Sequence, residues 1–235
     1  MIINSEVKKI VLLHGALGTK NDLLPLKNIL ASQYDVFSFN FSGHGDNAQQ
    51  EKDFSIEQFT EDLSVFVNEN NIKKASLFGY SMGGYVALNY ALTNADSVVK
   101  IFTLGTKFDW NAEFATKQAK FLNAEKIQEK VPAFATYLAA KHAPNHWEAV
   151  VAKTASMMLR LGENPLLNEN TLPQINVPTA ITIGDADDMV TVAESEKVAS
   201  LMPQAKFLTI SNTTHPIEKV NHLLIAETLL SFLAQ

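Results

Sequence analysis

The segment Gly79–Gly84, which reads G-Y-S-M-G-G, constrains the fold more than any other part of this chain. It follows the apolar run Ala75–Phe78, which predicts a buried strand, and precedes the run Tyr85–Leu92, which predicts a helix. A G-x-S-x-G sequence at a strand-to-helix turn places its serine on a sharp, strained corner with the hydroxyl above the sheet. Gly79 and Gly83 are required there because a Cβ would crowd the corner. The pattern alone also occurs in ordinary glycine-rich turns, so other segments must support it.

Three further apolar runs predict strands that end in loops with polar side chains or glycine. In chain order they are Lys8–Leu13 before His14 and Gly15, Ala180–Ile183 before the acidic loop 184–190, and Lys206–Ile210 before the loop that contains His215. A serine, an acidic loop and a histidine therefore follow one another along the chain, each just past the C-terminal end of a predicted strand.

This order of motifs resembles that of the α/β-hydrolase superfamily, specifically its small lidded serine esterases. The resemblance covers the chain except for the region between about 106 and 175. It implies an α/β-hydrolase core of residues 1–105 and 176–235 and a helical lid, residues 106–175, inserted in that core. Alternating apolar and amphipathic stretches independently predict a mostly parallel sheet, of about six strands, with helices on both faces. Because the first strand begins near the N-terminus, we expect the antiparallel hairpin common in the family to be mostly missing.

Several helix boundaries can be predicted from capping residues. Ser55 and Thr191, each followed three residues later by Gln or Glu, are typical of helix starts. In the lid, Asn145 predicts another helix start and Gly162 predicts a helix end. Apolar residues at near-helical spacing also predict a helix over 124–140.

The resemblance implies that Ser81 is a nucleophile and that His215 is its base. A serine hydroxyl needs a base to take its proton as it attacks, and an imidazole can accept that proton and later deliver it to the leaving group. A buried carboxylate must hold the imidazole in the right tautomer. The family's spacing places this acid three residues after the strand-end glycine, which gives Asp187, while Asp185 and Asp188 remain alternatives.

The resemblance also assigns the two N–H donors that a tetrahedral intermediate needs, namely the backbone groups of Ala16 and Met82. The candidates for substrate binding are large and mostly in the lid: Leu17, Trp110, Trp147, Met157 and Met158. Each of the lid side chains has the alternative interpretation that it only packs lid helices against each other. As a set, they favour a small-molecule ester with a hydrophobic acyl or alcohol part.

Composition excludes several other classes of function. The formal net charge of −6 argues against a nucleic-acid partner, and the lack of cysteine excludes a thiolate nucleophile, a disulfide and a cysteine-ligated metal. The start Met1–Glu6 lacks the features of a signal peptide, and no apolar stretch approaches the roughly 20 residues that span a bilayer. We therefore expect a cytoplasmic protein without a membrane partner. We expect no cofactor and no metal, since His142 and His146 lack an obvious carboxylate partner. The oligomeric state is not readable.

The resulting prediction is a serine hydrolase that cleaves a small or medium acyl ester or thioester through a Ser-His-Asp triad and an acyl-enzyme. Two alternatives use the same fold: a lyase of the menaquinone-pathway type or a C–C hydrolase, and a ligand-binding receptor that retains the triad. That lyase usually carries an arginine just after the glycine-rich motif to bind a substrate carboxylate. This chain has Tyr85 there, which argues against the lyase.

Overall fold

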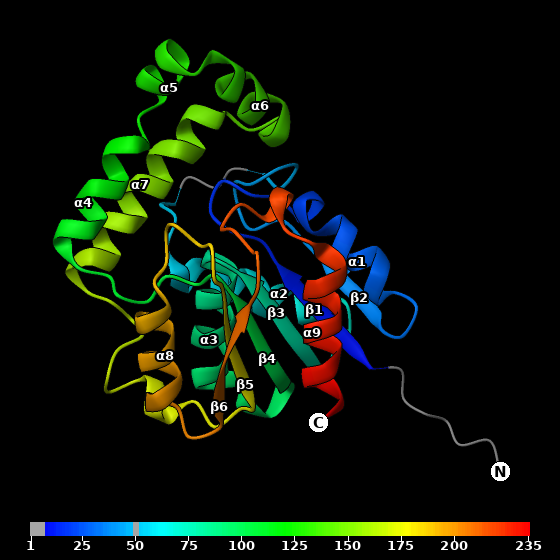
Figure 1. Ribbon diagram of the computed structural model, residues 1–235. Helices are drawn as coiled ribbons and strands as arrows, with labels where there is room; N and C mark the ends of the chain where they lie inside the picture. The colour runs from blue at the N-terminus through cyan, green and yellow to red at the C-terminus, as the bar shows by residue number, and fades with distance from the viewer. Residues whose placement is uncertain (1–7, 49–51) are drawn as a thin grey trace.

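The computed structural model of the protein describes residues 8–48 and 52–235. Met1–Glu6, on which the prediction of a cytoplasmic location partly rests, lie outside this range. The described residues form one sheet of six parallel strands with helices on both faces (Figure 1). The strands are β1 (Lys9–Leu13), β2 (Asp35–Ser38), β3 (Ala75–Tyr80), β4 (Val98–Leu104), β5 (Thr179–Gly184) and β6 (Ala205–Ile210). The predicted fold class is confirmed.

The strand order β2-β1-β3-β4-β5-β6 places the first strand, β1, inside the sheet. The chain runs from β1 outward to β2, crosses back to β3, and then continues to the opposite edge at β6. In such sheets ligands bind at the carboxyl ends of the strands where the direction of winding reverses, here between β1 and β3. The pairing of Leu13 with Gly79 sets the loop after β1 beside the glycine-rich turn after β3.

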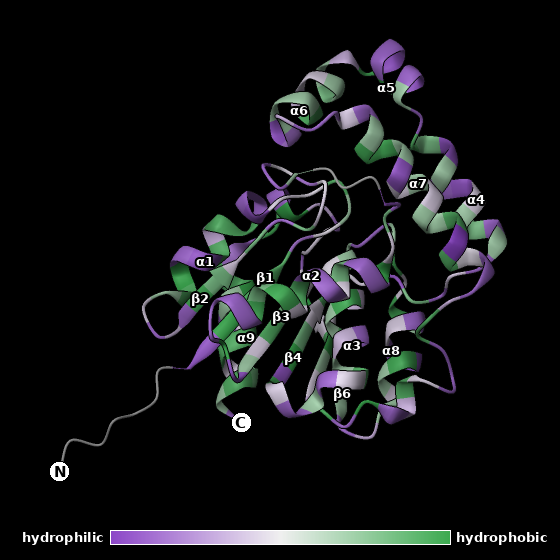
Figure 2. Cartoon of the chain, turned by 180° about the vertical axis from the view of Figure 1, so that it is seen from behind, coloured by the Kyte–Doolittle hydropathy of each residue, from purple (hydrophilic) through white to green (hydrophobic). Residues whose placement is uncertain are grey.

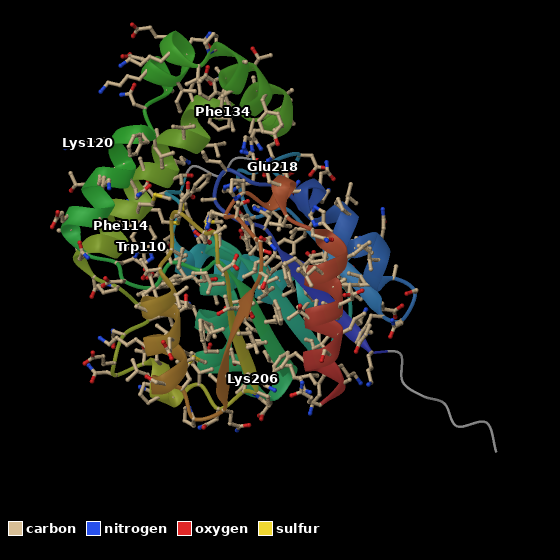
Figure 3. All side chains as sticks on the ribbon, viewed as in Figure 1. Trp110, Phe114, Lys120, Phe134, Lys206 and Glu218 are labelled. Atoms are coloured by element: carbon tan, nitrogen blue, oxygen red, sulfur yellow. The ribbon has the colours of Figure 1, made fainter. Side chains whose placement is uncertain are left out.

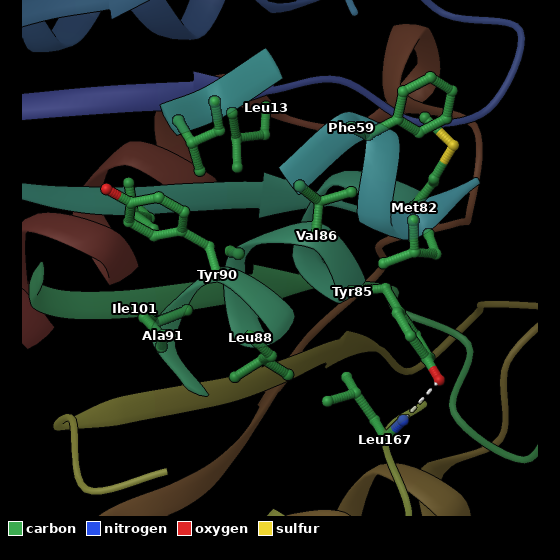
Figure 4. Packing of buried hydrophobic residues seen from close by; sticks show 14 of the residues in the cluster. Leu13, Phe59, Met82, Tyr85, Val86, Leu88, Tyr90, Ala91, Ile101 and Leu167 are labelled. Carbon is green, nitrogen blue, oxygen red and sulfur yellow. Dashed lines mark hydrogen bonds between the residues drawn. The ribbon is translucent and has the colours of Figure 1, made fainter. Parts of the chain in front are cut away.

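Helices cover the sheet in two layers. One layer consists of α1 (Leu24–Leu30) and α9 (His222–Ala234), and the other of α2 (Ile56–Glu69), α3 (Met82–Asn94) and α8 (Val192–Leu201). The ribbon of β1 and β3 is coloured mostly as hydrophobic residues (Figure 2), in agreement with the buried residues of these strands. The first turns of α3 are buried on nearly all sides, so the sequence there is apolar throughout and lacks amphipathic periodicity (Figure 4).

The capping residues confirm two of the predicted helix starts. The Ser55 hydroxyl accepts a hydrogen bond from the backbone N–H of Gln58 at 3.1 Å. Thr191 and Glu194 form a full capping box at the start of α8. The last helix, α9, begins at His222. The side chain of Asn221 accepts the N–H groups at that end, and 217–219 form a short 3₁₀ turn.

Four helices lie above the C-terminal ends of the strands, in the region predicted to be a lid (Figure 1). They are α4 (Ala112–Phe121), α5 (Ala124–Lys130), α6 (Pro132–His142) and α7 (Trp147–Glu163). The single helix predicted over 124–140 is divided in two, since Pro132 has no N–H to continue α5 and instead starts α6. The cap predicted at Asn145 is also wrong. The helix begins after His146, and the Asn145 amide donates to the carbonyls of Gly45 and Asn47.

Gly162 is the second-last residue of α7, so the helix ends one residue later than the sequence predicted. A Cβ at this position would lie 2.4 Å from the Cβ of Ala115 in α4 and 2.8 Å from the carbonyl oxygen of Asn111. The glycine therefore allows the close contact of α4 with α7.

Replacing Gly162 with alanine should destabilise the protein, although alanine favours helices by roughly 0.5–1 kcal/mol over glycine. The added methyl group has no room beside Ala115, and overpacking of this kind lowers the free energy of unfolding by about 1–3 kcal/mol. Denaturant unfolding of Gly162→Ala measures the change. Glu163→Ala, an exposed change at the next position, should shift the free energy by less than about 0.5 kcal/mol. A stabilised Gly162→Ala would contradict this account of the helix contact.

Candidate active site

Ser81 occupies the turn between β3 and α3 with φ 51° and ψ −118°. A non-glycine residue in this region carries strain of about 1–3 kcal/mol, which neighbouring contacts must hold in place. The Ser81 N–H donates to the carbonyl of Leu104 at 2.8 Å, and the Ser81 carbonyl accepts from the Thr106 hydroxyl at 2.9 Å. Hydrogen bonds to the end of β4 therefore fix the strained residue on both sides.

The glycines of the motif permit a close approach of the α3 N-terminus to the sheet. A Cβ at Gly79 would lie 2.4 Å from the Cα of Gly84, and one at Gly83 would lie 2.3 Å from the carbonyl oxygen of Leu13. These distances confirm the prediction that side chains at both positions would crowd the corner. They also place the first turn of α3 directly against the end of β1.

His215 and Asp187 lie in the loops after β6 and β5, and their side chains meet. The distance from His215 Nδ1 to Asp187 Oδ2 is 2.8 Å. The other carboxylate oxygen accepts the backbone N–H groups of Met189 and Val190, both at 2.9 Å. The Tyr80 hydroxyl donates to the His215 carbonyl at 2.9 Å, which holds the histidine loop against the end of β3.

The surroundings of Asp187 favour its ionised form. Burial alone would raise the pKa of the carboxyl group. The hydrogen bond and charge of His215, with the N–H groups of Val190 and Met189, outweigh it, so that the pKa of Asp187 lies below its ordinary value. Asp185 and Asp188 are exposed. Of the three acids that the sequence left open, the structure brings Asp187 to the histidine.

Ser81 and His215 line the same cleft. Among the hydrogen bonds of the described residues, none joins the Ser81 hydroxyl to His215. Such catalytic hydrogen bonds are often long without substrate and tighten when it binds. The structure thus brings Ser81 and His215 to the wall of one cleft, but their side chains are not hydrogen-bonded to each other.

The loop after β1 carries the two residues predicted beside the reacting carbonyl, Ala16 and Leu17. The Gly18 N–H donates to the Gly15 carbonyl at 3.0 Å, and Leu17 has a φ of 55°. Ala16 lines a cavity together with Ser81 and Met82, the first residue of α3. In the part of the chain that the structure describes, the N–H groups of Ala16 and Met82 make no hydrogen bond, so both remain candidates for holding an oxyanion.

Two spaces of unequal size open on Ser81. The small cavity, of about 40 Å³, has a mostly apolar wall from α4, α7 and the segment before α4, including Trp110, Met157 and Met158. The large cleft, of about 620 Å³, runs beneath α5 and α6 and is lined by Leu17, His215 and Met158 among others.

Trp147 lines neither space. It packs with Ile127, Leu138 and Val151 in a separate core of the lid. The position of Trp147 agrees with the packing interpretation that the sequence left open for lid residues. Figure 3 shows Trp110 and Phe114 at one end of the lid helices and Phe134 at the other end, across from Glu218.

Sequence reasoning did not single out Phe134 and Val131, whose exposed side chains line the large cleft. Both belonged to the apolar positions near helical spacing that predicted a helix over 124–140. The available signal was Pro132, because a proline inside an apolar helical pattern interrupts the helix.

One charged side chain, Lys107, lies in the wall of the small cavity within the described residues. Its Nζ is 2.6 Å from the Glu194 carboxylate, and both side chains are largely buried, so the cation is already paired. Tyr85 also lines this cavity. Its hydroxyl oxygen accepts the N–H of Leu167 at 2.8 Å, and burial raises the pKa of Tyr85 to about 12 (Figure 4).

Three buried histidines form a cluster where the lid meets the core. The ring centroid of His44 lies 5.1 Å from that of His14 and 5.7 Å from that of His142. His142 of α6 accepts the N–H of Gly45 through Nδ1 and donates from Nε2 to the carbonyl of Leu17. His14 supports its own loop, as predicted, through a 2.8 Å hydrogen bond to Gly15.

Burial keeps these histidines neutral. It lowers the pKa of His14 and that of His142 to about 4, and the pKa of His44 well below its ordinary value. The charged groups facing them, Asp22 and Lys141, form an ion pair at 2.7 Å. Ordinary histidine titrates near pH 6.5, so the unfolded chain takes up protons between about pH 6.5 and 4 that the folded chain cannot bind.

The free energy of unfolding should therefore fall as the pH is lowered from about 6.5 to 4, by up to roughly 1 kcal/mol per pH unit for each buried histidine. Denaturant unfolding at pH 7, 6 and 5 measures this slope. His142→Gln should reduce the slope, while His146→Gln, at an exposed position, should leave it unchanged. Equal slopes in wild type and His142→Gln would show that the cluster does not control acid stability.

Other kinds of site find no support in the described ranges. Residues 8–48 and 52–235 contain no group of three or more His, Cys, Asp or Glu side chains that could hold a metal ion. None of the helices formed by these residues has the length and apolar character needed to cross a bilayer.

The chain is similar to known proteins in sequence and in fold. The family model for the α/β-hydrolase fold matches residues 8–156. A Haemophilus influenzae protein with a provisional esterase/lipase name is 22% identical over 229 residues, which cover 91% of this chain and 78% of that protein. A 2-succinyl-6-hydroxy-2,4-cyclohexadiene-1-carboxylate synthase of Yersinia pseudotuberculosis is 25% identical over 252 residues, covering 96% and 87%. The enol-lactonase structure from Burkholderia xenovorans has a TM-score of 0.75 at 19% identity, covering 99% and 94%, and so shows a shared fold.

Proposed function

The chain belongs to the α/β-hydrolase fold family, and from that premise we propose that it is a serine hydrolase acting on carboxylic esters or thioesters. The observation that carries the proposal is the position of Ser81. It is held at a strained turn, at the meeting point of a small cavity and a large cleft, and the cleft also contains a histidine paired with a carboxylate. The esterase/lipase name of a relative that spans 91% of the chain supports the same class of activity.

The chemistry follows from the roles of these groups. The Nδ1–H of His215 donates to Asp187, which leaves the Nε2 lone pair to accept the Ser81 proton. The serine oxygen then attacks the substrate carbonyl, and the N–H groups of Ala16 and Met82 hold the negative oxygen that forms. His215 returns the proton to the leaving-group oxygen or sulfur, which departs and leaves an acyl-serine. A water molecule then attacks the acyl-serine and gives a proton to His215. The carboxylic acid is released as His215 returns that proton to the Ser81 oxygen.

The lyase alternative needs a cation for a substrate carboxylate near Ser81. The residue after the motif is Tyr85, whose hydroxyl oxygen accepts a hydrogen bond from the N–H of Leu167. Lys107, in the small cavity, is paired with Glu194. These contacts favour a hydrolase, although one relative is named a synthase. A receptor that retains the triad would instead give a burst of one product per protein followed by very slow turnover.

Ser81→Ala should remove ester hydrolysis, lowering kcat by on the order of 10⁶ if the three groups act as a unit. The methyl side chain fits the same turn, so circular dichroism should show an unchanged fold. A fluorophosphonate probe followed by peptide mass spectrometry should label Ser81 in the wild type and nothing in the mutant. Labelling of a different serine would overturn the proposal.

Asp187→Asn should lower kcat by about 10⁴, by analogy with other triads, because the amide favours the wrong imidazole tautomer. Asp185→Asn and Asp188→Asn provide matched controls in the same loop. Their side chains are exposed, so each should reduce kcat far less. Steady-state rates on a simple ester decide between them, and a larger loss in Asp188→Asn than in Asp187→Asn would mean that a different acid orients His215.

A further inference from the structure

We propose that the preferred substrates are esters of a short acyl group with a larger, apolar, uncharged alcohol. This inference rests on the proposed hydrolase function and assigns the two parts of the ester to the two spaces at Ser81. Ala16, Ser81 and Met158 line both the small cavity and the large cleft, so the reacting carbonyl lies where they join. The two halves of a bound ester must then extend in opposite directions, one into each space.

The position of His215 decides which half goes where. The histidine lines the large cleft and is absent from the wall of the small cavity. As the general acid, it must reach the leaving-group oxygen to deliver a proton. The alcohol half therefore lies in the large cleft, and the acyl half lies in the small cavity, which Met82 also lines.

The small cavity limits the length of the acyl group. Its volume is about 40 Å³, whereas one water-sized group needs roughly 10–15 Å³ by the same measure. An acyl chain of about two to four carbons fills this space. Its lining includes buried Met157 and Leu161 and also Trp110, whose indole N–H donates a 3.1 Å hydrogen bond to the Lys107 carbonyl.

The large cleft offers an apolar surface that can hold the alcohol part of the ester. Phe121, Val131 and Phe134 are 67%, 51% and 40% exposed and all line the cleft. A lone exposed apolar side chain is ordinary, but several along one cleft mark a binding surface. The lid and core charges there, Lys141 and Asp22, neutralise each other at 2.7 Å, and Glu218 adds a negative charge that disfavours an anionic alcohol.

Two isomeric esters test this assignment without changing total size or hydrophobicity. Hexyl acetate places six carbons in the alcohol, and ethyl hexanoate places six in the acyl group. Acid release in a pH-stat should give a kcat/KM at least tenfold higher for hexyl acetate. Equal values, or a higher value for ethyl hexanoate, would overturn the inference while leaving the hydrolase proposal intact. If no ester is hydrolysed and the fluorophosphonate probe fails to label Ser81, the proposed function itself fails.

Variants in the large cleft and in the small cavity should change the preference for the alcohol part and for the acyl part, respectively. Phe134→Ser should lower kcat/KM for hexyl acetate at least fivefold more than it lowers kcat/KM for ethyl acetate. Leu159→Ser is the matched control, since Leu159 is also a lid residue, is 40% exposed like Phe134, and lines neither space. Met157→Ala should raise the ratio of ethyl hexanoate to hexyl acetate activity. Equal effects of Phe134→Ser on hexyl and ethyl acetate would refute the placement of the alcohol.

Discussion

The close contact between the first turn of α3 and the end of β1 is the constraint on which the rest of the site depends. Only glycine fits at Gly79 and Gly83, because any side chain would meet backbone at less than 2.5 Å. This contact forces the strained conformation of Ser81 and sets the start of α3 beside the loop that carries Ala16. A strained serine and two neighbouring N–H groups thus arise from one packing requirement.

The lid is joined to the same loop that the proposed mechanism uses to hold the oxyanion. His142 donates to the carbonyl of Leu17, Lys141 pairs with Asp22, and the Asn145 amide donates to two carbonyls of the loop after β2. These contacts all lie on α6 or directly after it. As a result, the helix that bounds the large cleft also supports the backbone next to the reacting carbonyl. Protonation of His142 at Nδ1 would remove the hydrogen bond that this nitrogen accepts from the N–H of Gly45.

Local sequence determined much of this protein, for reasons that act over a few residues. The G-x-S-x-G turn, the caps at Ser55 and Thr191, and the alternation of apolar runs depend on backbone sterics and nearby hydrogen bonds, and the structure has them as predicted. Two of the errors have different causes, one local and one tertiary. Pro132 divides a helix, and Asn145 serves a distant loop instead of its own helix.

Tertiary structure alone decided which acid meets His215 and what shape of space surrounds Ser81. The family's spacing favoured Asp187 and left Asp185 and Asp188 as alternatives, and the folding of two separate loops brings Asp187 to the imidazole, 28 residues away along the chain. The small cavity and the large cleft have walls from the lid, the loop after β1 and the loops after β3 and β5. Apolar lid residues have the same pattern whether they pack together, as Trp147 does, or face a substrate, because side-chain direction depends on how the helices dock.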